Sequence, residues 1–215
     1  MKIGVFDSGI GGKAIADRLQ ADYPDSEVLY VDDHKNVPYG SRTQENIIQL
    51  TDTAIQPLLK QECDVIVIAC NTATAAAIEI LKDKYPDTPF IGLEPMVKPA
   101  ALLTQSGVIA ICATPFTLNS GRYASLKENY ASDVVVLEPD CSEWASMIET
   151  DHTDIQEITD AINGVCVAGA DVIVLACTHY HWIKEEIIKI ADGRAQVIDP
   201  SDAISRRVAD VLGIN

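Results

Sequence analysis

The sequence predicts an α/β protein made of two similar, doubly wound parallel-sheet domains. Short runs rich in Val, Ile and Leu alternate with helical patterns, which is typical of βαβ units around a buried parallel sheet. In addition, the string Asp64-Val-Ile-Val-Ile-Ala-Cys70-Asn-Thr recurs 107 residues later, from position 64 to position 171, as Asp171-Val-Ile-Val-Leu-Ala-Cys177-Thr-His. A shared string of this length favours duplication of one unit, so we expect two halves related by pseudo-two-fold symmetry.

The strands and helices can be assigned in chain order. We expect strands at the apolar runs 2–6, 28–31, 65–69, 90–93, 108–112, 134–137, 172–176 and 196–198. We expect helices over residues 43–60, 74–84, 181–190 and 204–212.

Two prolines, Pro95 and Pro99, interrupt the pattern near the middle of the chain and place the domain boundary there. We expect an N-terminal domain of residues 1–95 and a C-terminal domain of residues 96–202. The last segment, about 203–215, is expected to pack back on the N-terminal domain, because both halves need a similar number of helices. The predicted active site lies in the cleft between the two domains.

Charge and composition narrow the class of partner. The chain has 215 residues with 16 Lys and Arg against 32 Asp and Glu, a formal net charge of −16. An excess of acid on this scale argues against nucleic acid or an anionic membrane as the main partner. No apolar run reaches the roughly 20 residues of a membrane-spanning helix, and the first residues do not resemble a secretory signal. We therefore expect a small-molecule substrate.

The six cysteines predict neither a disulfide framework nor a metal site. Most of them lie inside apolar runs, and no Cys-x-x-Cys spacing occurs. A cytoplasmic, reducing environment is the better interpretation, with no bound metal.

Cys70 and Cys177 are the strongest candidates for chemistry. Each follows a buried strand and precedes a helix, at the edge where parallel sheets bind ligands. Backbone N–H groups and the helix dipole there favour the thiolate. Two related thiols suit a two-base reaction, in which one removes a proton from a stereocentre and the other returns one to the opposite face. A disulfide or thiol redox couple is the competing interpretation.

Polar residues beside the thiols are candidate assistants. Asn71, Thr72 and Thr178 can cap the next helix and bind a carboxylate at its N-terminus. His179 can hold or relay a proton for Cys177, because imidazole titrates near neutral pH.

The first loop, Asp7-Ser8-Gly9-Ile10-Gly11-Gly12-Lys13-Ala14, allows two interpretations. It fits the dinucleotide fingerprint, with Asp32 and Asp33 at suitable spacing, which predicts a nucleotide-binding oxidoreductase. Alternatively, its glycines let the backbone approach a small ligand, with Ser8 as a donor and Asp7 as a base near Cys70. Further along, Tyr39 and Gly40 form either a simple turn or a wall over the ligand.

These residues and their order resemble the glutamate racemases of the aspartate/glutamate racemase superfamily. The resemblance covers essentially the whole chain. It rests on the motifs Gly4–Gly12, Pro38–Gly40, Ala69–Ala73, Glu94-Pro95, Ala113–Thr117, Ala176–Tyr180 and Ile198-Asp199.

The resemblance implies an isomerase that interconverts L- and D-glutamate without a cofactor and supplies D-glutamate for bacterial peptidoglycan. By position, Cys70 and Cys177 would be the two bases, assisted by Asp7 and His179. The substrate would be bound by Ser8, Tyr39, Gly40, Asn71, Thr72, Thr117, Glu149 and Thr178. The family also implies a homodimer. Aspartate or another acidic amino acid stays open as the substrate.

Three departures from the family pattern stand out. The segment Cys141-Ser-Glu-Trp-Ala-Ser-Met-Ile-Glu149 replaces the usual Cys-Pro-x-Leu-Val-Pro-x-Val-Glu, so Trp144 is expected to reshape that wall. His181 stands where a proline is usual. The chain is also shorter than is typical, with the difference expected between Glu149 and Asp171 and near the C-terminus.

Overall fold

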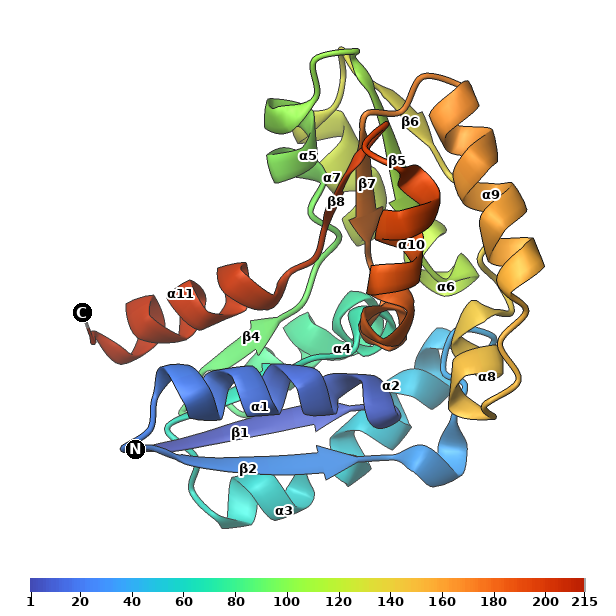
Figure 1. Ribbon diagram of the computed structural model, residues 1–215. Helices are drawn as coiled ribbons and strands as arrows, with labels where there is room; N and C mark the ends of the chain where they lie inside the picture. The colour runs from blue at the N-terminus through green and yellow to red at the C-terminus, as the bar shows by residue number, and fades with distance from the viewer. Residues whose placement is uncertain (215) are drawn as a thin grey trace. The chain divides into compact units, whose positions relative to one another are not determined.

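The computed structural model describes residues 1–214, and within them the chain forms two compact α/β units (Figure 1). Unit 1 consists of Met1–Leu93 together with the chain from Pro200 onward, and unit 2 is Glu94–Asp199. Each unit contains one four-stranded parallel sheet, with the order β2-β1-β3-β4 in unit 1 and β6-β5-β7-β8 in unit 2. Counted from the start of each unit, the two orders are the same. The expected parallel α/β fold is therefore confirmed.

In unit 1, β1 pairs with both β2 and β3, and β3 pairs with β4. The strands are β1 (Lys2–Asp7), β2 (Glu27–Asp32), β3 (Val65–Ile68) and β4 (Phe90–Gly92). The helices are η1 (Ile10–Gly12), α1 (Lys13–Asp22), η2 (His34–Asn36), α2 (Gln44–Ala54), α3 (Gln56–Lys60), α4 (Asn71–Lys84) and α11 (Ser201–Leu212), where η marks a 3-10 helix.

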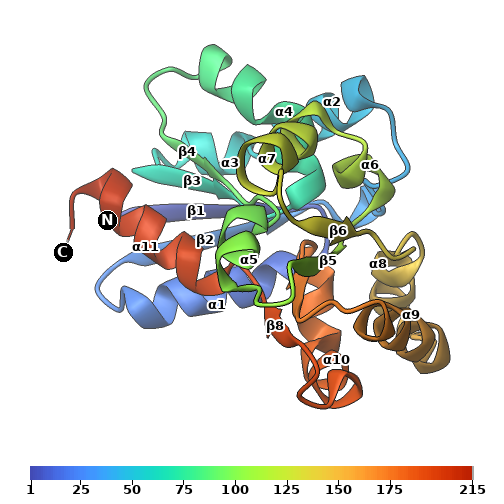
Figure 2. The same cartoon turned by 90° about the horizontal axis from the view of Figure 1, so that it is seen from above.

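Alternation along the unit 1 strands sends side chains to two cores. One face of the sheet packs against α1 and α11 in a cluster that includes Ile3, Val67 and Ile204. The opposite face lies against α3 and α4, where a Cβ at Gly4 would meet Leu58 and one at Gly92 would meet Thr74. Both views show α11 beside α1 (Figures 1 and 2). The hydroxyl of Tyr23 donates to the Ser205 carbonyl at 2.6 Å, which ties the last helix to the first.

Unit 2 repeats this plan with a different set of helices. Its strands are β5 (Val108–Cys112), β6 (Val135–Leu137), β7 (Val172–Leu175) and β8 (Gln196–Ile198). Its helices are α5 (Val97–Leu103), α6 (Pro115–Leu118), α7 (Gly121–Tyr130), α8 (Trp144–Glu149), α9 (Ile155–Val167), η3 (Thr178–Ile183) and α10 (Lys184–Ala191). One face of the sheet packs against α8, α9 and α10, and the other against α5 and α7 (Figure 1).

All eight expected strands are present, but the four expected helices have different bounds, and the one expected over 204–212 begins at Ser201. The helix expected over 43–60 is interrupted at Ile55, because Pro57 in the first turn of α3 cannot donate a backbone hydrogen bond to the preceding turn. The helix expected to begin at 74 begins at Asn71, because Cys70 itself is the N-cap. The helix expected over 181–190 is divided into η3 and α10.

The aspartate shared by the two repeated strings has the same structural role in each unit. Asp64 accepts the backbone N–H of Lys2, the first residue of β1, at 2.8 Å. Asp171 accepts the N–H groups of Gln105 and Ser106 at 2.7 and 2.8 Å, just before β5. Each carboxylate therefore fixes the chain that enters the first strand of its unit.

Replacing Asp171 with asparagine is expected to destabilise the protein by about 1–2 kcal/mol at neutral pH. Burial opposes ionisation, but hydrogen bonds from Thr104, Gln105 and Ser106 outweigh it and lower the pKa of Asp171 to about 2, from 3.8. Because the folded-state pKa is depressed, this stabilisation is complete above pH 4 and is lost as the pH falls toward 2. Urea unfolding of the wild type and of Asp171→Asn between pH 7 and pH 2 should show that the difference in their free energies of unfolding becomes smaller as the pH falls. A difference that stays constant with pH would contradict this account.

Among residues 1–214, none of the helices combines the length and apolarity needed to cross a membrane.

Candidate active site

In unit 1 the candidate residues gather where β1 and β3 end. Cys70 follows β3 and is the N-cap of α4, and its sulfur accepts the N–H of Ala73 at 3.4 Å. The Ser8 hydroxyl donates to the same sulfur at 3.2 Å. The first turn of a helix and a hydroxyl donor both stabilise negative charge on sulfur. Cys70 is 6% exposed, so its sulfur lies in a mostly buried, polar environment.

Asp7 is the last residue of β1 and is fully buried. It directly precedes Ser8, whose hydroxyl donates to the Cys70 sulfur. Its Oδ1 accepts the N–H of Gly9 at 2.9 Å, and its own carbonyl accepts the N–H of Asp33. Gly12 comes so close to Asp7 that a Cβ atom there would lie 2.3 Å from the Asp7 Cβ. The glycine-rich loop therefore wraps around an aspartate of its own chain.

Asn71 is a buried amide whose polar atoms have no partner in the described protein. Neither its Nδ2 nor its Oδ1 makes a hydrogen bond within residues 1–214, although the residue is only 3% exposed. Leaving such groups unsatisfied costs about 1–3 kcal/mol each. A bound ligand that offers both an acceptor and a donor would satisfy this amide.

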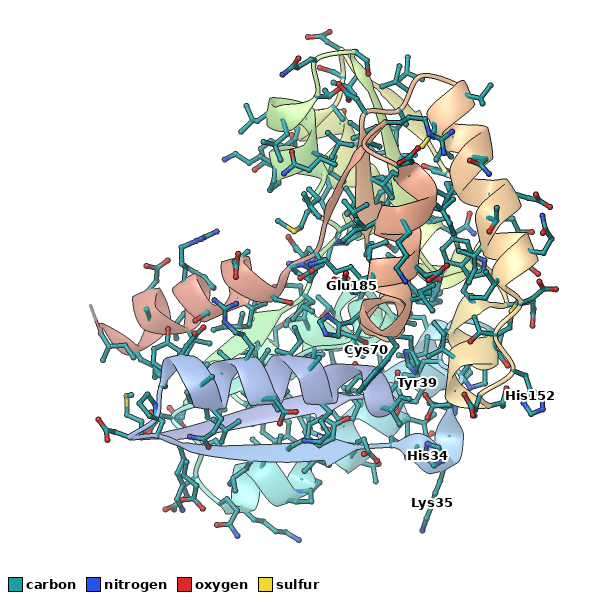
Figure 3. All side chains as sticks on the ribbon, viewed as in Figure 1. His34, Lys35, Tyr39, Cys70, His152 and Glu185 are labelled. Carbon is teal, nitrogen blue, oxygen red and sulfur yellow. The ribbon has the colours of Figure 1, made fainter. Side chains whose placement is uncertain are left out.

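Tyr39 lies at the same end of the unit 1 sheet as Cys70 (Figure 3). Its hydroxyl donates to Asp33 at 2.6 Å, and Asn36 donates to the same carboxylate. Burial, together with Asp33, raises the pKa of Tyr39 well above its ordinary range. The hydroxyl proton of Tyr39 is therefore held in the hydrogen bond to Asp33. A ligand could contact the ring of Tyr39, its hydroxyl oxygen as an acceptor, or its backbone.

Arg42 holds the turn after Tyr39. Its guanidinium donates to the carbonyl of Asn36 and, at 2.9 Å, to Oδ1 of Asn46 in α2. Gly40, predicted to line the ligand with Tyr39, is half-buried in this turn. Sequence reasoning missed Asn36 and Arg42, and considered Asp33 only as part of the dinucleotide fingerprint, because nothing in the spacing of polar loop residues shows which of them pair.

In unit 2 the second thiol lies beside a histidine–glutamate pair. Cys177 follows β7, and its sulfur lies 3.8 Å from Nδ1 of His179. The other ring nitrogen, Nε2, lies 2.5 Å from Oε2 of Glu149, at the end of α8. Both side chains of this pair are 5% exposed. A carboxylate in this position fixes the orientation of the imidazole and supports positive charge on it.

This arrangement gives Glu149 a contact that the sequence did not predict. We expected Glu149 among the substrate-binding residues, and the structure places its carboxylate on His179. The 30 residues that separate the two positions hide this pairing from any local motif.

The remaining candidates follow the strands of their own units. Thr72, on the first turn of α4, and Thr178, at the start of η3, are buried. Thr117 is buried in α6, which follows β5, and its hydroxyl accepts a hydrogen bond from Thr114 at 3.0 Å. The structure therefore brings Asp7, Ser8, Asn71 and Thr72 together with Cys70 in unit 1. Thr117, Glu149, Thr178 and His179 belong to unit 2.

The other histidines are exposed, and two of them, His34 and His152, are labelled in Figure 3; the third is His181. Within residues 1–214, no group of three or more His, Cys, Asp or Glu side chains is arranged to hold a metal ion.

The fold and the two thiols define a class: α/β proteins of two topologically equivalent units, each with a cysteine where its third strand ends. The sequence matches the family described as Asp/Glu/Hydantoin racemase over residues 13–208. The chain belongs to this family of racemases, which are isomerases.

Individual relatives and solved structures also indicate a racemase. The chain is 36% identical to the glutamate racemase of Ectopseudomonas mendocina, and the match covers 98% of this chain and 82% of that protein. The fold is similar to that of Escherichia coli glutamate racemase in complex with L-glutamate and the activator UDP-MurNAc-ala. That comparison has a TM-score of 0.85 at 28% identity and covers 99% of this chain and 82% of the other. For the Francisella tularensis glutamate racemase in complex with D-glutamate, the TM-score is 0.84 at 30% identity, and the match covers 99% of this chain and 80% of the other.

These comparisons do not favour the nucleotide-binding alternative, and the contacts agree with them. The Asp7 carboxylate occupies the N–H of Gly9, where a fingerprint loop would bind phosphate, and would repel a pyrophosphate. Asp33, which would bind the ribose, is engaged by Tyr39 and Asn36.

Proposed function

We propose that this protein interconverts L- and D-glutamate without a cofactor, with the thiols of Cys70 and Cys177 as its two bases. The observation that carries the proposal is the duplicated thiol, placed after the third strand of both sheets. A redox role would need only that two thiols meet. Two-base racemisation uses one proton-transferring group on each face of the same carbon, and two equivalent thiols supply such a pair.

The proton inventory of the reaction is balanced. The sulfur of one cysteine, as thiolate, takes the α-proton, and the electron pair left on the carbon delocalises into the adjacent carboxylate. The other cysteine, as thiol, gives its proton to the opposite face of that carbon. The product is the mirror image, and the two thiols have exchanged protonation states. The reverse reaction then starts from the state that the forward reaction leaves.

The surroundings of the two thiols suit these roles. The Ser8 hydroxyl and the first turn of α4 support charge on the sulfur of Cys70. In unit 2, His179 can take a proton from Cys177 or return it, and the Glu149 carboxylate balances the charge of the imidazolium. We propose that Asp7 assists Cys70 in the corresponding way from the end of β1.

The unpartnered amide of Asn71 supports an amino acid as the ligand. Its Nδ2 would donate to a carboxylate oxygen, and its Oδ1 would accept from an ammonium group. A free amino acid carries both groups on one carbon. We propose that Ser8, Tyr39, Gly40, Thr72, Thr117 and Thr178 complete the substrate contacts. Glutamate is the proposed substrate because the relatives at 36% identity bear that name.

We further propose that the D-glutamate formed supplies peptidoglycan synthesis. The family resemblance supports this role, as does the relative from Escherichia coli whose activator is UDP-MurNAc-ala.

The direct test is chiral chromatography of the purified protein with L-glutamate, D-glutamate and L-aspartate in separate reactions. We expect both glutamate enantiomers to approach a 1:1 mixture, with aspartate reacting at least about 100-fold more slowly, the discrimination that buried polar contacts can supply. Activity should survive dialysis against EDTA and should not require added pyridoxal phosphate or NAD.

Two outcomes would contradict the proposal. Racemisation of aspartate but not of glutamate would overturn the substrate. Proton NMR in D₂O that shows no loss of the α-hydrogen of either amino acid would overturn the racemase activity in this chain.

A further inference from the structure

The short helix α8 connects two groups of contacts in unit 2. It begins at Trp144 and ends at Glu149, whose carboxylate meets His179. Glu149 is therefore placed by whatever fixes α8. A helix of six residues is about 9 Å long, so a small rotation at one end displaces the other end appreciably.

The start of α8 is anchored on the segment that carries His179. Trp144 is fully buried, and its ring meets that of Tyr180 edge to face, with centroids 5.3 Å apart and planes at 65°. Tyr180 is the residue after His179 and is also fully buried. Edge-to-face aromatic pairs contribute about 0.5–1.5 kcal/mol beyond the area that they bury.

One backbone carbonyl strengthens this anchor. The carbonyl of Cys141 accepts the N–H of Trp144 at 3.3 Å and the hydroxyl of Tyr180 at 3.1 Å. In turn, the N–H of Tyr180 donates to the carbonyl of Cys177 at 3.1 Å. A chain of contacts thus runs from the start of α8 through Tyr180 to the thiol-bearing residue.

The indole nitrogen of Trp144 takes no part in this chain. Its Nε1 is buried and has no hydrogen-bond partner within the described residues. The side chain of Trp144 is therefore held by the packing of its ring alone, so its effect on the site depends on shape, and a phenylalanine ring should reproduce much of it.

We propose that Trp144 is a positioning residue that, with Tyr180, fixes α8 on η3 and so sets the contact of Glu149 with His179 beside Cys177. The indole of Trp144 is assigned no direct part in the proton transfers. It acts through Glu149, and it acts on the proton transfer at Cys177 rather than on the one at Cys70. The inference rests on the proposed two-thiol racemisation.

A racemase offers a readout that separates the two proton transfers. The enantiomers have equal free energy, so any variant lowers kcat/KM equally in both directions. The primary isotope effect behaves differently, because it rises when the labelled bond is broken in the slower step. Slowing the transfer at Cys177 should raise the isotope effect for the enantiomer that Cys177 deprotonates and lower it for the other.

The experiment compares Trp144→Leu, Trp144→Phe and Tyr180→Phe with wild type, using D- and L-glutamate deuterated at the α-carbon. For Trp144→Leu we expect kcat to fall about 10- to 100-fold, as displacement of a catalytic group does, and the two isotope effects to move in opposite directions. In Trp144→Phe, kcat and the two isotope effects should lie closer to the wild-type values. Tyr180→Phe removes only the hydrogen bond to Cys141, so it should shift the two isotope effects in the same sense as Trp144→Leu but by less. This variant replaces Trp144→Leu in the test if Trp144→Leu does not fold.

Val165→Ala is the matched control. Val165 belongs to the same buried cluster but lies ten residues into α9, so its truncation should lower stability and leave both isotope effects unchanged. Isotope effects in Trp144→Leu and Tyr180→Phe equal to those of wild type would overturn the positioning role. Absence of racemisation in the wild-type protein would instead overturn the proposed function, so the two failures are distinguishable.

Discussion

Replacing Cys70 or Cys177 with alanine is expected to lower glutamate racemisation by at least about 10²–10⁴-fold while leaving the fold intact. Each variant lacks one of the two groups that move the α-proton, so neither can complete an inversion. Each should still exchange the α-hydrogen of one enantiomer with D₂O, because the remaining thiol can remove that proton and return a deuteron to the same face. Chiral chromatography measures inversion, and NMR measures exchange.

The two variants should exchange opposite enantiomers, which identifies the enantiomer served by each thiol. Cys63→Ala is the control: Cys63 is buried against Gly4, away from the candidate residues, and its loss should leave turnover unchanged. Turnover near that of wild type in either Cys70→Ala or Cys177→Ala would contradict the two-base mechanism.

Gly12→Ala is expected to impair both stability and activity. The new Cβ would lie 2.3 Å from the Cβ of Asp7 and 3.0 Å from its Cγ, distances that unstrained contacts do not reach. Relief requires movement of Asp7 or of the loop, which breaks the hydrogen bond from Gly9. We expect a loss of about 1–3 kcal/mol in the free energy of unfolding, as in overpacked cores, and a fall in kcat of about 100-fold.

The matched control for this change is Gly164→Ala. Gly164 lies inside α9, and a Cβ there would have nothing within 4 Å. Because alanine is the better helix former, this variant should be more stable by about 1 kcal/mol and equally active. Thermal unfolding and steady-state kinetics of both variants test the pair. Wild-type kinetics in Gly12→Ala would mean that the placement of Asp7 does not matter.

The strands and the thiols could be predicted from local sequence because burial on both faces leaves a plain apolar pattern. Val65–Ile68 and Val172–Leu175 are fully buried, and their shared flanking residues revealed the duplication. The ends of helices were less predictable. A cysteine is an unusual N-cap, so we expected Asn71 or Thr72 to cap this helix, whereas α4 begins directly after Cys70.

The pairings around the thiols could not be predicted for a different reason. His179 was expected to assist Cys177 because it lies two residues away, but its contact with Glu149 depends on how α8 packs against η3. Similarly, the residue that holds the Tyr39 hydroxyl, Asp33, looked like a ribose ligand by spacing alone. Side-chain partners distant in sequence are set by tertiary packing, which single-sequence patterns do not record.

The order in which the chain passes through its units has a consequence for biosynthesis. Unit 2 is one continuous segment, Glu94–Asp199, whereas the core of unit 1 includes Ile204 and Val208 from α11. During translation, unit 2 can therefore form all its contacts while one face of the unit 1 sheet still lacks its last helix. Until α11 emerges, the apolar side chains beside α1 stay uncovered, and a nascent chain in that state is exposed to chaperones and to aggregation.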